Sequence, residues 1–128
     1  MQHEPNRRLE VLALLADPRP MQPLLDSLRE HDFAVDVAND LMTAQRLFFG
    51  AGGHDCLVLG PDVAPGTAQR VLASLRSVDP RLATATFGPE VEKAGGESRT
   101  AVLSGFHPGS RAGAGALLRF LTGLAHRG

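Results

Sequence analysis

The residues best placed to do chemistry in this sequence are those that follow its short apolar runs. In an open parallel sheet, functional side chains gather where the strands end at their carboxyl edge. The run from Cys56 to Leu59 is apolar and bounded by polar residues and by Gly60 and Pro61, the pattern of a buried central strand. Neither Gly60 nor Pro61 carries a carboxylate, hydroxyl or thiol. The sequence therefore predicts that this strand ends without a reactive group.

Cysteine and histidine offer little chemistry elsewhere. Cys56 lies inside the apolar run, where a thiol packs as a small apolar group and its pKa rises. The histidines His3, His31, His54 and His126 are scattered without the spacing of zinc ligands. No nucleophile elbow of the Gly-x-Ser-x-Gly type is present. We therefore expect no metal site, no cofactor and no enzymatic activity.

The composition is that of one folded domain. The chain has 128 residues, of which 43% are hydrophobic, and a formal net charge of -1. There is no basic excess to suggest nucleic-acid binding, and no apolar run is long enough to span a membrane. The N-terminal residues lack a signal-peptide core, and a single cysteine suits a reducing compartment. We expect one cytoplasmic domain over residues 1–128, with its core at about 9–125, that contacts neither nucleic acid nor membrane.

Apolar strand-like runs alternate with helical patterns along the chain. Strands are expected at 9–15, 33–38, 56–59, 82–87 and 100–103, and helices at about 21–30, 41–48, 68–75 and 114–125. A further helix is expected at 89–99, but Gly95 and Gly96 lie in its middle and cost roughly 2 kcal/mol of helix propensity relative to alanine. We therefore expect that helix to be short, frayed or absent. The alternating order predicts a parallel sheet with helices on both faces.

With this order and length, the chain resembles the receiver domains of two-component response regulators over about residues 9–124. The local patterns that carry the resemblance are Leu14-Leu15-Ala16-Asp17 before a proline-bearing helix, Phe33-x-Val35-x-x-Ala38, Ala44 in the second helix, Asp55-Cys56-Leu57-Val58-Leu59 and His107-Pro108. The resemblance implies an α/β, flavodoxin-like (βα)5 fold. Such a fold is a three-layer sandwich around a five-stranded parallel sheet, here with a degraded fourth helix.

The resemblance also implies where a phosphorylation site would lie. A working receiver holds Mg²⁺ with two acidic residues after the first strand and a third after the third strand. This third acid also accepts the phosphoryl group. A Thr or Ser and a Lys bind the phosphoryl oxygens. In this sequence Ala16 and Asp17 fall at the first two acids, Gly60 at the acceptor, Thr86 at the hydroxyl and His107 at the lysine. One carboxylate cannot form the metal cage, and a glycine cannot be phosphorylated. We expect the standard phosphotransfer to be absent.

Two residues leave alternatives open at this degenerate pocket. Asp62 is either a turn or cap residue or, in a shifted loop, a second carboxylate beside Asp17 that restores Mg²⁺ binding and phosphoryl acceptance. His107 is either an exposed loop residue without a role or, when protonated, a partner for Asp17 that locks the pocket.

The face formed by the fourth helix, the fifth strand and the last helix passes the signal on in ordinary receivers, and it is altered in this sequence. Ser104 stands where the family often has a switching Tyr or Phe, and Arg99, Arg111 and Arg119 are candidate rim contacts for a partner. We interpret the chain as a pseudoreceiver, a phosphorylation-independent module that binds a signalling or output protein, with homodimerisation also open.

A small-ligand sensor is a further alternative. The glycine-rich residues 105–115 lead into the last helix, where free backbone N–H groups and Arg111 could bind a phosphate. This reading predicts a nucleotide second messenger as the ligand, although the glycine spacing does not match a dinucleotide fingerprint.

Overall fold

The computed structural model describes residues 8–91 and 99–127, which form a parallel sheet and the helices around it. The elements in chain order are β1 (Glu10–Leu14), the short 3-10 helix η1 (Arg19–Met21), α1 (Gln22–Glu30), β2 (Ala34–Ala38), α2 (Leu41–Gly50), β3 (Cys56–Leu59), α3 (Pro65–Arg76), β4 (Ala83–Thr86), β5 (Thr100–Val102) and α4 (Arg111–Arg127). The strand order is β2-β1-β3-β4-β5, with every neighbouring pair parallel. The predicted five-stranded α/β fold is confirmed.

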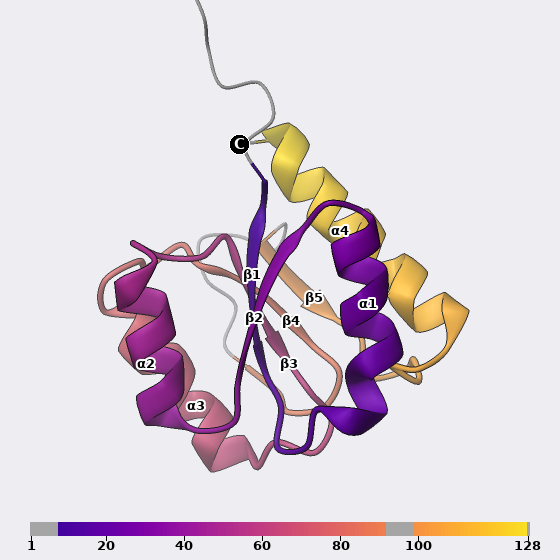
Figure 1. The fold of residues 1–128 in the computed structure, drawn as a ribbon. Helices are drawn as coiled ribbons and strands as arrows, with labels where there is room; N and C mark the ends of the chain where they lie inside the picture. The colour runs from indigo at the N-terminus through magenta and orange to yellow at the C-terminus, as the bar shows by residue number, and fades with distance from the viewer. Residues whose placement is uncertain (1–7, 92–98, 128) are drawn as a thin grey trace, which may run out of the picture.

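Helices cover both faces of the sheet, as Figure 1 shows, with α1 and α4 on one face and α2 and α3 on the other. Successive side chains of a strand point to opposite faces, so each buried strand contributes to two apolar layers. In β1, Val11 and Ala13 join the layer under α1 and α4, while Leu12 and Leu14 join the layer under α2 and α3. This double burial explains why the central strands are continuous apolar runs in the sequence.

Two helices begin earlier than the sequence predicted. Helix α3 begins at Pro65, because the missing N–H of proline is no loss in a first turn, where these groups have no partner within the helix. Helix α4 begins at Arg111 instead of 114, because the Ser110 hydroxyl accepts a hydrogen bond from the Gly113 N–H at 3.0 Å and caps the helix. A Cβ at Gly113 would collide with the carbonyl oxygen of His107, so this glycine lets α4 pack against the preceding loop.

The helix predicted at 89–99, with its expected degradation, falls mostly outside the described residues, since 92–98 are not among them. The described part of the predicted helix before that gap, 89–91, is not helical. Within the described ranges, no helix combines the length and apolar character that crossing a membrane requires.

The parallel register brings the ends of the strands to one edge. The pairs Leu14–Leu59, Leu59–Thr86 and Thr86–Val102 align the last residues of the four strands β1, β3, β4 and β5. The ladder also continues one step further, since the Gly60 N–H donates to the Leu14 carbonyl at 3.0 Å. The loops that follow these strands are therefore neighbours in space although they are far apart in the sequence.

Candidate functional site at the carboxyl edge of the sheet

A cavity of about 320 Å³ opens at this edge, between the segments that follow β1, β3, β4 and β5. It is lined by Asp17, Pro20, Met21, Pro61, Asp62, Phe87, Ser104, Phe106, His107 and Pro108. The structure thus brings together Asp17, Asp62, Ser104 and His107, which the sequence had singled out. The apolar lining, which includes Phe106 at 38% exposure, was missed, because an isolated Phe in a Gly-rich loop shows no periodicity.

Gly60 is buried at the end of β3 and has no space for a side chain. A Cβ at this position would lie 2.8 Å from Cδ2 of Leu15, itself fully buried, and 3.2 Å from Oδ1 of Asp62. The absence of a side chain at residue 60 is therefore matched by the packing around it. The position offers no nucleophile to a phosphoryl donor.

Asp62 connects two loops that are distant in the sequence. Its carboxylate accepts hydrogen bonds from the backbone N–H groups of Ala16, at 3.3 Å, and of Asp17, at 3.0 Å. It is thus more than a local turn residue, and it does lie beside Asp17, as the shifted-loop alternative requires. However, it reaches the backbone of Asp17, and both of its oxygens are engaged by the β1 loop.

The side chain of Asp17 is held by Arg19. The guanidinium of Arg19 donates from Nε to Oδ1 at 3.0 Å and from Nη2 to Oδ2 at 2.9 Å, and the Arg19 backbone N–H also donates to Oδ1. These hydrogen bonds from Arg19 lower the pKa of the Asp17 carboxyl below its ordinary value. Sequence reasoning missed Arg19, although an Asp two residues before an Arg in a proline-rich turn is a signal for such a pair.

Thr86 is buried, and its hydroxyl is used within its own loop. The hydroxyl donates to the Pro89 carbonyl at 2.7 Å and accepts from the Gly88 N–H at 3.1 Å. A Cβ at Gly88 would lie 2.7 Å from Cα of Pro61, so the loops after β3 and β4 are in direct backbone contact. This hydroxyl does not line the cavity.

His107 is exposed and takes part in hydrogen bonds of the β5–α4 loop. Its Nδ1 accepts from the Gly109 N–H at 3.1 Å, and its carbonyl accepts from the Ser110 hydroxyl at 2.6 Å. In the described part of the chain the Asp17 carboxylate pairs with Arg19, and no bond joins it to His107. Of the two alternatives for His107, the structure has the exposed loop residue, and the pairing of a protonated His107 with Asp17 is not the arrangement found.

The residues at this edge do not fit a Mg²⁺ ion as they are arranged. Mg²⁺ needs free carboxylate oxygens, and Ala16 and Gly60 supply none. The carboxylate of Asp17 is paired with Arg19, which leaves the Asp62 carboxylate alone at this edge, and a single carboxylate does not form the cluster that a Mg²⁺ site of this kind uses. Over residues 8–91 and 99–127, no three His, Cys, Asp or Glu side chains gather in a way that could hold a metal ion.

The predicted partner residues lie on or near the β5–α4 face. Ser104, Arg111 and Arg119 are exposed there, but Arg99 is half-buried and its Nε donates to the carbonyl of Arg81. Arg99 therefore serves as a structural contact in this arrangement. Exposed apolar surface was not foreseen on this face: Val102 of β5 is 62% exposed.

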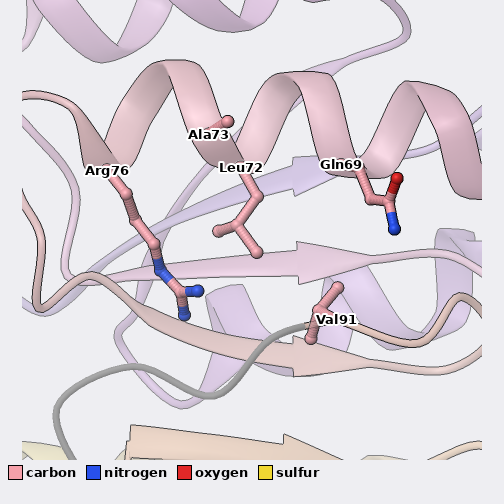
Figure 2. A pocket seen from close by; sticks show the side chains of 5 residues that line it. All are labelled: Gln69, Leu72, Ala73, Arg76 and Val91. Carbon is pink, nitrogen blue, oxygen red and sulfur yellow. The ribbon is translucent and has the colours of Figure 1, made fainter.

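A second cavity, of about 420 Å³, lies along α3, and Figure 2 shows its lining by Gln69, Leu72, Ala73, Arg76 and Val91. The guanidinium of Arg76 donates to the Leu82 carbonyl and to the Thr84 hydroxyl, which ties α3 to the start of β4 and the residue before it. No residue predicted for the site lies in this cavity.

The start of α4 gives limited support to phosphate binding. The hydroxyl of Ser110 already accepts the Gly113 N–H, and the Ser110 carbonyl accepts the Ala114 N–H. Arg111 is exposed and lines neither the cavity at the carboxyl edge nor the cavity along α3.

Comparison with solved structures identifies the fold. The chain is similar to the chemotaxis response regulator CheY4 of Vibrio cholerae, with a TM-score of 0.62 and 17% sequence identity over 92% of this chain and 99% of that chain. No protein-family profile and no curated protein matches the sequence. At this level of identity the similarity establishes the fold alone, which is the flavodoxin-like fold of CheY.

Proposed function

We propose that this protein is a pseudoreceiver: a non-enzymatic, cytoplasmic regulatory module that acts through a protein partner and without aspartyl phosphorylation. The observation that carries the proposal is the packing at Gly60. The position that would need an acceptor side chain has none, and Leu15 and Asp62 occupy the space into which one would extend.

The other groups of the edge support the same function. The carboxylates of Asp17 and Asp62 and the hydroxyl of Thr86 are all engaged in hydrogen bonds within the protein. Recruiting Asp62 to a metal ion would also take an acceptor away from the N–H groups of Ala16 and Asp17. Those N–H groups would then need another acceptor, and an N–H group left without one costs free energy.

The surface proposed for the partner is the face around β5 and the start of α4. Val102 exposes an apolar side chain there, and Arg111 and Arg119 are exposed on α4. Protein interfaces combine apolar contacts with a polar rim in which arginine is frequent. The proposed partner is a signalling or output protein. A second copy of this chain is the alternative partner.

Incubation of the protein with acetyl phosphate and Mg²⁺, followed by intact-mass spectrometry, tests the absence of phosphorylation. The expected result is an unchanged mass under conditions in which a phosphorylatable receiver is fully modified. A stoichiometric adduct that disappears in Asp62→Asn would instead establish the alternative in which Asp62 accepts the phosphoryl group.

Capture of partners from the native cell extract tests the interaction surface. The variant Val102→Asp should lose the captured protein, because a charge at this exposed site opposes an apolar contact. Met42→Asp is the matched control, since Met42 of α2 is also exposed, at 76%, but lies on a different element. Equal capture by both variants would rule out the β5 face as the interface.

A further inference from the structure

We propose that the cavity at the carboxyl edge receives an arginine side chain of the protein partner, with its guanidinium on Asp62. The inference rests on the proposed interaction function and names the chemistry of the partner. Three features of the cavity carry it: its size, its apolar walls and the one negative charge left unbalanced at its rim.

The cavity is large enough to admit one long side chain. At about 320 Å³, the cavity is at the small end of the range for ligand pockets, about 300–1,000 Å³. A nucleotide bound there would bring its phosphates close to the carboxylate of Asp62, and these like charges would repel one another. The cavity therefore favours a single inserted group over the nucleotide considered from the sequence.

The walls are suited to an aliphatic stem. Met21 and Phe87 are buried, at 2% and 3% exposure, while Phe106 is 38% exposed and also lines the cavity. Long basic side chains bury their methylene groups along apolar surface while the charged end stays near water. A guanidinium can also stack on an aromatic ring such as that of Phe106.

The charges at the rim favour a cation. Asp17 and Arg19 neutralise one another through their paired hydrogen bonds. Asp62 accepts two backbone N–H groups but has no ion pair among the described side chains, so its negative charge is left unbalanced. A carboxylate has about four acceptor positions, of which two remain for an incoming donor. A guanidinium can use both of them, which an ammonium group does less well.

The test is an NMR titration of the ¹⁵N-labelled full chain with three probes: N-acetylarginine methylamide, the lysine analogue and the neutral citrulline analogue. We expect the arginine probe to shift the amides of Asp17, Asp62 and Phe106 and to bind about threefold to fivefold more tightly than citrulline, as for an exposed ion pair. The difference should shrink as salt is added. Equal binding of arginine and citrulline, or shifts confined to other parts of the protein, would overturn the proposal.

Two variants complete the experiment. Asp62→Asn keeps the shape of the side chain and removes its charge, and Ser104→Phe fills the cavity from its rim. Both variants should weaken the binding of the arginine probe. Asp26→Asn, on the exposed surface of α1, should leave that binding unchanged. Unchanged binding in both variants contradicts the proposal. If these variants retain the partner that Val102→Asp loses, the arginine inference fails while the proposed interaction function stands.

Discussion

Oδ2 of Asp62 lies 3.0 Å from the backbone nitrogen of Asp17, so a carboxylate after β3 holds the loop after β1, 45 residues earlier in the chain. The contact joins these two loops through both oxygens of the Asp62 carboxylate, which accept the backbone N–H groups of Ala16 and Asp17. It therefore accounts for the position of Asp62 without phosphotransfer chemistry, and it exposes the remaining lone pairs of the carboxylate at the rim of the cavity.

Removal of this carboxylate should loosen the β1 loop. In Asp62→Ala, the N–H groups of Ala16 and Asp17 lose their acceptor, but water can replace it because the contact is exposed. We expect a loss of about 1 kcal/mol in the free energy of unfolding and faster hydrogen exchange at these two amides. Asp26→Ala is the control. Unchanged exchange in Asp62→Ala would show that these hydrogen bonds do not form in solution.

A methyl group at residue 60 should destabilise the fold. In Gly60→Ala, the added Cβ meets the buried Leu15 at 2.8 Å and Asp62 at 3.2 Å. Overpacking of this kind costs about 1–3 kcal/mol, measurable by urea unfolding. Gly50→Ala is the matched control, since a Cβ there has nothing within 4 Å and the substitution lies at the end of a helix. Equal stability of the two variants would contradict the packing described.

The pKa of Asp17 should depend on Arg19. Hydrogen bonds from Arg19 lower the pKa of this carboxyl, so the ionised form stabilises the fold above the ordinary carboxyl pKa. This contribution is lost as the pH falls through the lowered pKa. In Arg19→Gln, a ¹³C NMR titration should show the pKa of Asp17 moving up toward its usual value. Arg29→Gln should leave it unchanged, and the same pKa in both variants would exclude the ion pair.

The thiol of Cys56 should be unreactive in the folded protein. Burial in β3 raises its pKa to about 12, so little thiolate forms at pH 8. A chromogenic disulfide reagent should therefore react at a rate set by unfolding, and rapidly in guanidinium chloride. Because the pKa is raised in the folded state, this group opposes folding as the pH rises from about 9 toward 12. Rapid labelling under native conditions would show that β3 is accessible.

The predicted strands coincide closely with the observed ones, and the predicted helix boundaries less so. Buried strands such as β3 are apolar on both faces, which is visible in a short window of sequence. Helix starts depend on caps, and Ser110 was not recognised as the residue that begins α4. The predicted weakness around Gly95 and Gly96 stays a prediction, because those residues lie outside the described ranges.

Some features of the candidate site could likewise be predicted from the sequence, and others required the structure. The absence of a side chain at Gly60 and of a lysine at His107 is a matter of residue identity, and so could be stated at once. The hydrogen-bond partners of Asp17 and Asp62 could not be predicted from the sequence. A carboxylate can bond to a neighbouring side chain or to a distant backbone N–H group with similar free energy. Another example is His54, whose Nε2 lies 2.8 Å from Oδ2 of Asp36 although nothing in the sequence relates the two residues.

The sequence by itself determined the order of the elements, the burial of Cys56 and the absence of a side chain at residue 60, because periodicity and residue type are local properties. Only the tertiary structure decided that Asp62 accepts hydrogen bonds from the β1 loop and that Arg19 forms an ion pair with Asp17. It also decided that apolar side chains line the cavity at this edge. These relationships depend on which loops the parallel register brings to the same edge, and that register is a property of the whole folded chain.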